Sequence, residues 1–382
     1  ARARLGPAVS LETGFLASND PVDSFALSLK QERFSATDFF LSDPNHPGTA
    51  RDWNAAVAAT WTFDVSGALR GEARAAAAMA DASERLASRS RDGAVFDALV
   101  AFSKARRSEE RLALLAERQA DAEKDVALAD SMREQGLTTA ADPARARSAL
   151  AEIRGEIASE KAAQAAARAD LAASIGSDDA ARPLAPLPAG APVAEKASYS
   201  RDDAAASRLA SESARAAEKA ASAGRWPSLM VEARYQTHAP RPSARWGDSS
   251  SALAAVRLPL FASGAVDARI AEARAARQVA ESSERETLAL AETEAVSARA
   301  SLAAAESRLA AFSEAESAAR TAREIQDARY REGAASLGDL LEARAAELRA
   351  RLGVANARAD RAVAEAQLRL AVGLPPEGEG SR

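Results

Sequence analysis

An internal repeat restricts the folds open to this chain more than any other feature of its sequence. The stretch MREQGLTTAAD, which ends at Asp142, resembles YREGAASLGDL further along the chain. Four pairs of residues keep the same offset of 197 positions: Gly67 with Gly264, Gly136 with Gly333, Asp142 with Asp339, and Gly176 with Gly373. The chain is therefore a tandem repeat, and each copy is expected to form one supersecondary unit.

The composition argues against several classes of protein. The net charge of -5 does not suit a nucleic-acid binder, which needs a basic face. The absence of cysteine excludes disulfides, zinc–thiolate sites and thiol catalysis. Alanine supplies most of the 47% of hydrophobic residues, which favours closely packed helices over a large globular core. No apolar run reaches the length of about 18 residues that a transmembrane helix needs.

Each repeat begins with two segments of roughly alternating apolar and polar residues. In the first repeat these are Pro7 to Phe15 and Trp53 to Phe63, and in the second Pro227 to Gln236 and Ser251 to Phe261. Alternating segments of about ten residues have the length of tilted strands that cross a membrane. The polar segment Leu16 to Asp52 joins the first two strands, and we expect it to form a long external loop.

Aromatic residues gather in or beside these four segments. They are Phe15, Trp53, Trp61, Phe63, Trp226, Tyr235, Trp246 and Phe261. Strands favour aromatic residues in general, which is one explanation. The other is a girdle of aromatic side chains at the two membrane interfaces. We favour the girdle, because aromatic residues make up only 4% of the chain.

After Gly67 and Gly264 the pattern becomes helical and stays so. A helix from Gly67 to Gly136 would be about 104 Å long, a length typical of coiled coils. Heptad spacing in the last helix predicts a packing seam of eight residues: Leu341, Leu348, Ala355 and Ala362 at one position, and Ala345, Leu352, Ala359 and Ala366 at the other. The remaining Arg and Glu are interpreted as solvated faces.

A shorter helix is expected between the two repeats, before the segment AGRWP. Its length and that of the helix ending at Gly176 together roughly equal one long helix, so we expect the two to stack end to end. By symmetry, a further helix of about 30 to 60 residues is expected to precede Pro7. The sequence thus divides into seven regions: a first β-hairpin with its external loop (1–66), a first helical hairpin (67–176), a Pro-rich linker (177–194), a short helix (195–225), a second β-hairpin (226–263), a second helical hairpin (264–373) and a tail (374–382).

The strands cannot form a complete membrane structure alone. Four strands have two open edges, which lipid does not tolerate, and a closed barrel needs about eight strands or more. Three copies would supply twelve strands, and cyclic symmetry would close the ring. The sequence therefore predicts an α+β membrane protein, in which a trimeric 12-stranded barrel is continuous with a long α-helical coiled-coil tunnel.

These features resemble the TolC-type outer-membrane efflux protein family. The resemblance covers about Pro7 to Gly373 and is most specific in RLPLFASGAVDARIAEARAARQVAE and in the segment from Ala328 to Gly373. In the first repeat, WTFDVSG lacks the proline of LPLFASG and has one residue more. The family's N-terminal helix, which can begin with a lipid-anchored cysteine, has no counterpart before Pro7.

The resemblance implies a homotrimeric exit duct, set in outer-membrane lipid and extending into the periplasm. It would dock to a periplasmic adaptor protein and to an inner-membrane pump of the RND or ABC type, with no cofactor. The helical tips would contact the adaptor through seven residues: Gly136, Leu137, Thr138, Gly333, Ala334, Ala335 and Ser336. A glycine suits each tip, because a sharp turn between helices needs a positive φ.

The resemblance also implies a gate of acidic residues just inside the tips. Asp339 and Glu342 occupy the matching positions, and three copies would form a negative ring that favours cations. In the alternative interpretation, Asp339 only caps the helix that it begins.

Other candidate sites and functions carry less support from the sequence. His46 and His238 each lie alone in a proposed external loop, so we expect no metal site there. A periplasmic coiled-coil adaptor or scaffold is the alternative function, but one would contain a single helical hairpin inside a small β-domain. An enzyme is the least favoured class, because this composition does not offer a compact core.

Overall fold

The computed structural model describes residues 2–35, 47–177, 182–187 and 201–377. His46, most of the 177–194 linker and the end of the tail lie outside these residues. The chain forms two compact units, one of Ala1–Ser83 with Ser207–Glu284 and the other of Glu84–Ala206 with Arg285–Arg382.

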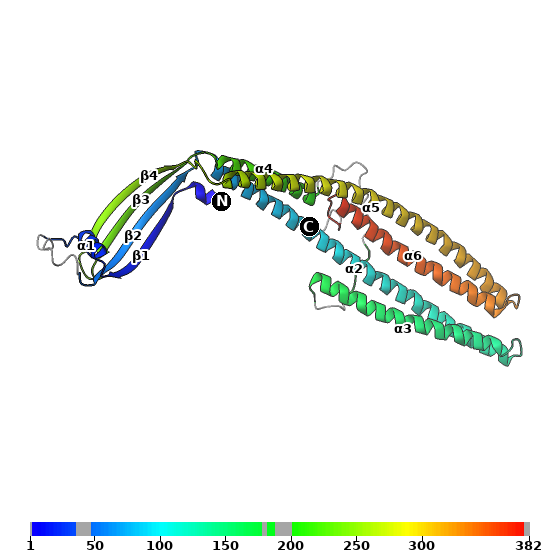
Figure 1. Ribbon diagram of the computed structural model, residues 1–382. Helices are drawn as coiled ribbons and strands as arrows, with labels where there is room; N and C mark the ends of the chain where they lie inside the picture. Colours follow the sequence, from blue (N-terminus) through cyan, green and yellow to red (C-terminus); the bar gives the residue numbers. More distant parts are fainter. Residues whose placement is uncertain (1, 36–46, 178–181, 188–200, 378–382) are drawn as a thin grey trace. The chain divides into compact units, whose positions relative to one another are not determined.

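The first unit contains a four-stranded antiparallel sheet in the order β1-β2-β3-β4, preceded by a 3-10 turn, η1 (Arg2–Leu5) (Figure 1). The strands are β1 (Ala8–Ser18), β2 (Ala50–Phe63), β3 (Ser228–Ala239) and β4 (Gly247–Arg257). The four predicted strands are thus confirmed, with different ends.

The end of β4 differs most from the prediction. The strand stops at Arg257, two residues before Pro259, so Phe261 follows the strand and does not belong to it. Proline has no N–H to donate to a neighbouring strand, which explains why the pairing does not continue.

The two faces of the sheet differ in chemistry. Because side chains alternate along a strand, the register places Phe15 beside Trp53 and Trp61 beside Val231 on one face. This face, called here the apolar face, also carries Val9, Leu11, Val57, Leu229 and Val256. The opposite, polar face carries an ion pair between Arg234 and Glu12 (2.9 Å) and a hydrogen bond from Gln236 to Ser249 (3.1 Å).

Helix α1 (Pro21–Lys30) lies within the segment that we expected to be a polar loop. Asp20 caps it by accepting hydrogen bonds from the backbone N–H groups of Val22 and Asp23, and Pro21 occupies the first helical turn. Both are recognised start signals, which the loop prediction overlooked.

The long helices confirm the repeat. Helices α2 (Ala68–Glu134) and α5 (Ala265–Arg331) both have 67 residues, and α3 (Ala141–Ile175) and α6 (Leu337–Ala371) both have 35. All six repeated glycines have a positive φ, between 64° and 79°. None of the described helices combines the length and the apolar character that crossing a membrane requires.

The short helix α4 (Asp202–Ala223) does not pair as expected. Arg201, directly before α4, donates a hydrogen bond to the carbonyl of Ala371 at the end of α6 (3.3 Å). The beginning of α4 therefore meets the end of α6, and the expected end-to-end stacking of α3 and α4 is wrong. Helices α3 and α6 are equally long, so length alone could not show which of them stacks on α4.

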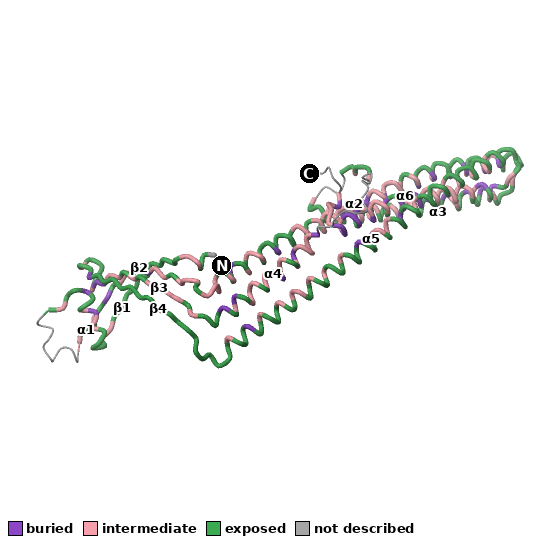
Figure 2. Tube along the Cα trace, turned by 90° about the horizontal axis from the view of Figure 1, so that it is seen from above, coloured by how far each residue is buried: buried purple, intermediate pink, exposed green. Residues whose placement is uncertain are grey.

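The predicted seam of α6 is packed along its whole length. None of its eight residues is exposed, and Ala355, Ala359 and Ala366 are buried. Gly353 and Val354 are buried as well. This part of α6 therefore packs through more than the two heptad positions of the predicted seam. Figure 2 shows buried residues at intervals along α6 and α2.

Candidate functional site

The turns at the two helical tips have the same backbone geometry. Gly136 (φ +74°) follows α2, and Gly333 (φ +72°) follows α5. At both, the glycine N–H and the next N–H bond back to carbonyls of the preceding helix, as from Leu137 to Met132 (2.9 Å) and from Ala334 to Arg329 (2.8 Å). These are the bonds of a Schellman motif. A Cβ on either glycine would meet no atom within 4 Å, so φ, not space, requires glycine here.

The predicted adaptor-contact residues lie at these tips. Five of the seven are exposed, and Thr138 and Ala335 are half-buried. Leu137 is the largest apolar side chain among the seven, and its exposed fraction is 70%. Beneath both tips one hydrophobic cluster joins four helices; its buried members are Ala129, Ala146, Tyr330, Leu337 and Leu340. The two tips are thus held together within the second unit.

Asp339 stabilises the start of α6. Ser336 is the N-cap, and its hydroxyl accepts a hydrogen bond from the N–H of Asp339 (3.2 Å). In return, the N–H and hydroxyl of Ser336 donate to Asp339 Oδ2 (3.1 and 2.8 Å), which completes a capping box. These hydrogen bonds, with a smaller effect of Arg329, hold the pKa of Asp339 below its ordinary value. The structure therefore shows that Asp339 helps to cap α6, although the N-cap itself is Ser336.

Glu342, the second predicted gate residue, is exposed on α6. It lies three residues after Asp339, so both carboxylates occupy one face of the helix. Both capping bonds use Oδ2 of Asp339, which leaves Oδ1 outside the capping box. The two acidic residues are close enough to contribute to one negative surface.

Tyr330 is buried in the cluster beneath the tips and is 6% exposed. Its hydroxyl has no hydrogen-bond partner among the described residues. Burial raises its pKa, and the carboxylates of Asp142 and Asp125 add to the effect. Tyr330 therefore remains a neutral phenol that contributes to packing.

A buried network of charges lies between the hairpins and was missed by the sequence interpretation. Asp125 of α2, 3% exposed, lies 2.7 Å from Arg344 of α6 and 3.4 Å from Arg118. Arg344 also contacts Asp327 of α5 (2.8 Å). Burial raises the pKa of Asp125 in spite of the two arginines. The network joins three helices, and the seven-residue spacing of Arg118 and Asp125, which puts both on one helical face, could have indicated it.

The aromatic side chains form contacts near both ends of the sheet. The rings of Phe15 and Trp53 are 4.9 Å apart at one end, and those of Trp61 and Phe63 are 4.2 Å apart at the other. Tyr235 pairs with Val57, midway between Trp53 and Trp61 along β2, so it is level with neither pair.

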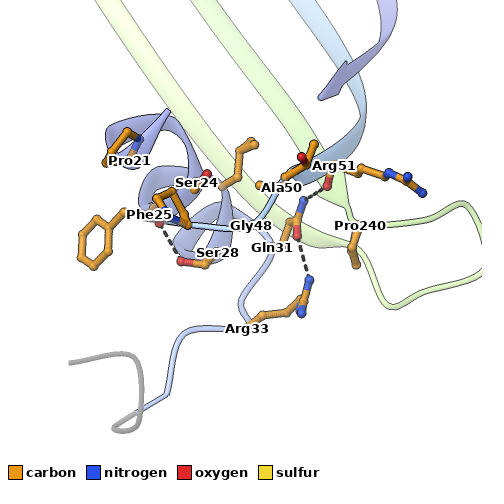
Figure 3. A pocket seen from close by; sticks show the side chains of 13 residues that line it. Pro21, Ser24, Phe25, Ser28, Gln31, Arg33, Gly48, Ala50, Arg51 and Pro240 are labelled. Carbon is orange, nitrogen blue, oxygen red and sulfur yellow. Dashed lines mark hydrogen bonds between the residues drawn. The ribbon is translucent and has the colours of Figure 1, made fainter. Parts of the chain in front are cut away.

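His238 does not lie in a loop, as we expected, but near the end of β3, where it is buried. Its Nδ1 lies 2.8 Å from Asp52 Oδ2. Gln31, directly after α1, donates from Nε2 to Asp52 Oδ1 (3.0 Å) and to the carbonyl of Arg51 (2.9 Å). Beside this cluster, α1 and the chain before β2 border a pocket of about 640 Å³ (Figure 3).

A four-stranded sheet with one apolar face, joined to two equal pairs of long helices, defines the class of outer-membrane channels with helical tunnels. The chain belongs to the outer membrane efflux protein family, whose sequence model matches residues 1–177 and 193–374. It is therefore an efflux channel of the outer membrane that extends into the periplasm. No curated protein matches the sequence.

Solved structures show the same fold at low sequence identity. A membrane protein from Pseudomonas aeruginosa is 22% identical, with a TM-score of 0.80 over 97% of this chain and 86% of the other. The outer membrane protein VceC of Vibrio cholerae is 20% identical, with a TM-score of 0.77 over 98% and 89%. The MtrE channel of Neisseria gonorrhoeae is 20% identical, with a TM-score of 0.77 over 98% and 82%.

Proposed function

We propose that three copies of this chain form a passive exit duct that docks to a periplasmic adaptor and an inner-membrane pump. The two-faced sheet carries this proposal. Its apolar face suits lipid and its polar face suits a water-filled lumen, while β1 and β4 are the edges of the sheet. Joining β4 of one copy to β1 of the next would satisfy both edges and close a barrel of twelve strands.

The spacing of the aromatic pairs supports a membrane span. Trp53 and Trp61 are eight residues apart, which is about 26 Å along a strand. A strand tilted by about 40° would cover about 20 Å of height, close to the apolar band of about 25 Å in outer-membrane barrels. We infer that Phe15, Trp53 and Trp246 belong to the outer girdle. The inner girdle would contain Trp61, Phe63, Trp226 and Phe261, and Tyr235 would face the apolar band between them.

The exposed tips support docking to an adaptor. Leu137 exposes an apolar side chain at the tip of the first repeat, and a partner that covers it would gain the free energy of its burial. The small residues Gly333 and Ala334 at the second tip allow a partner helix to approach closely. The adaptor would thus meet two tips of different shape in each copy.

Asp339 and Glu342 are proposed as the aperture. Three copies would bring six carboxylates to one narrow opening, and such a ring attracts cations and repels anions. The similar MtrE structure is described as an open state, which supports a tunnel that can change its aperture.

The proposal is tested by single-channel recording of the purified chain in planar bilayers. Wild type is expected to give small, cation-selective openings. Changing Asp339→Ala and Glu342→Ala together should reduce selectivity and enlarge the openings, because the negative ring is lost. Glu314→Ala removes an exposed carboxylate from a different helix, α5. It serves as the control and should leave both selectivity and opening size unchanged.

Two outcomes would contradict the proposal. If folded wild-type protein inserted in the bilayer gives no conductance, the proposed channel activity is wrong. Unchanged selectivity in the double variant would leave the channel but exclude Asp339 and Glu342 as its aperture.

A further inference from the structure

The end of α1 is attached to the sheet by a cluster of buried polar side chains, called here the clasp: Gln31, Asp52 and His238. Their exposed fractions are 5%, 1% and 6%. Gln31 donates to Asp52 (3.0 Å) and to the Arg51 carbonyl, and Asp52 holds His238 (2.8 Å). Figure 3 shows Gln31 directed at the start of β2. Buried polar groups cost free energy unless they are paired, so this cluster favours a single position for α1.

The clasp lies on the polar face of the sheet. Asp52 is two residues before Asn54, and Asn54 pairs with His238 in the register, so these side chains lie on the face opposite Trp53. Asn54 also donates to Asp52 (3.3 Å). Helix α1 therefore covers the polar face at the end of the sheet away from α2 (Figure 1).

The backbone after α1 also touches β4. A Cβ placed on Gly247, the first residue of β4, would lie 2.4 Å from the carbonyl oxygen of Lys30 and 2.9 Å from the carbonyl carbon of Gln31. Both are backbone atoms, so any side chain here would displace the segment. Leu27 of α1, 4% exposed, adds apolar packing. The position of α1 thus depends on a hydrogen-bonded clasp and on one close backbone contact.

We propose that α1 is an inward-folded cover at the external mouth of the channel, held in place by the clasp. The inference rests on the proposed function, in which the polar face lines the lumen. Twelve strands about 4.8 Å apart and tilted by about 40° enclose a ring roughly 24 Å across. Three helices, each about 10 Å wide, would cover most of such an opening. The cover limits the size of molecules that pass the mouth in either direction.

The test measures access to the lumen from outside intact cells that carry the full chain. The sequence contains no cysteine, so Ser251→Cys on the polar face of β4 provides a single reactive thiol below the cover. A small charged thiol reagent should react with it, whereas a maleimide carried on a polyethylene glycol chain should react slowly.

Opening the cover should admit the larger reagent. Gly247→Ala displaces the segment after α1, and Gln31→Glu places a second carboxylate beside Asp52. Each change should raise the rate at which the polymer reagent reacts with the Ser251→Cys thiol by about tenfold. The loss of hydrogen bonds to a buried carboxyl group shifts the equilibrium between the closed and open positions of α1 by about that factor. Gly48→Ala is the matched control and should change nothing, because a Cβ there meets no atom within 4 Å.

The outcomes separate this inference from the proposed function. Ser250→Cys pairs with Tyr235 on the apolar face and should not react with either reagent. Equal reaction of Ser250→Cys and Ser251→Cys with the small reagent would overturn the barrel itself. If only Ser251→Cys reacts with the small reagent, but the polymer reagent reacts with it as fast without Gly247→Ala or Gln31→Glu as with either change, the barrel stands and the cover is wrong. Gln31→Glu leaves the β4 backbone unchanged and decides the question if Gly247→Ala prevents assembly.

Discussion

The two repeats have the same architecture, yet the same pair of charges has a different environment in each. In the first repeat Arg147 and Asp130 form an ion pair of 2.7 Å, with exposed fractions of 57% and 35%. The equivalent residues in the second repeat, Arg344 and Asp327, lie 2.8 Å apart and are 15% and 16% exposed. There the arginine also contacts Asp125 of the first repeat.

The difference shows how a duplicated unit acquires separate roles. An exposed ion pair contributes little to stability, because water and salt screen it. The partly buried copy joins one hairpin to the other, and loss of its arginine leaves the buried Asp125 with Arg118 alone, 3.4 Å away. The first repeat therefore keeps the pair as a surface feature, whereas the second uses it to hold the hairpins together.

The largest expected effect is that of Arg344→Ala. Because this change leaves Asp125 buried without its nearest partner, it should lower stability by about 3–5 kcal/mol. The equivalent Arg147→Ala should cost about 1 kcal/mol or less. Thermal unfolding of the purified variants, followed by circular dichroism of the helices, compares the two.

Two further substitutions sharpen this comparison. Arg118→Ala and Asp125→Ala together, in the Arg344→Ala background, remove the remaining buried ion pair of the network and should recover part of the lost stability. Equal losses in Arg344→Ala and Arg147→Ala would show that the buried network does not join the hairpins.

Replacing either of two helical glycines by alanine should change stability by an intermediate amount, in opposite directions in the two repeats. A Cβ on Gly353 of α6 would lie 2.5 Å from the ring of Phe312, whereas Gly155, within one residue of the equivalent position in α3, faces open space. Gly155→Ala should stabilise its helix by about 0.5–1 kcal/mol. Gly353→Ala should destabilise by about 1–2 kcal/mol, since overpacking exceeds the gain in helix propensity. Unfolding midpoints that shift in the same direction would refute the close approach of α5 and α6.

The repeat, the strands and the helical hairpins could be predicted because each depends on local sequence. Positive φ at Gly136 and Gly333 and the period of α6 are properties of a short stretch of chain. The environment of Asp125 could not be predicted in this way, because its partner Arg344 lies far away in the sequence. The same is true of His238, whose burial depends on Asp52 in another strand.

Other misses had a local signal. Asp20 and Pro21 marked the start of α1, and Pro259 marked the end of β4. For Asp339, both interpretations came from sequence, and the structure adds that capping uses only one carboxylate oxygen. A gate depends on how copies assemble, which the residues of one chain do not determine.

The smallest expected change in stability concerns the caps at the starts of α3 and α6. Ser336 caps α6 through its side chain, whereas Ala140 before α3 makes no such bond. At neutral pH, Ser336→Ala should therefore cost about 1 kcal/mol, and Thr139→Ala, at the equivalent position, only a few tenths. Hydrogen exchange of the first turn of each helix measures both.

The pH dependence of this cap follows from the lowered pKa of Asp339. The folded state favours the charged carboxylate, so the capping contribution is present above the ordinary value of 3.8 and is lost as the pH falls through the lower folded pKa. Asp339→Asn removes this titration and corrects for the intrinsic pH dependence of exchange. Wild-type protection of the first turn of α6 should therefore approach that of the variant only below about pH 4, and a constant difference down to pH 2 would show that the carboxylate does not contribute through its charge.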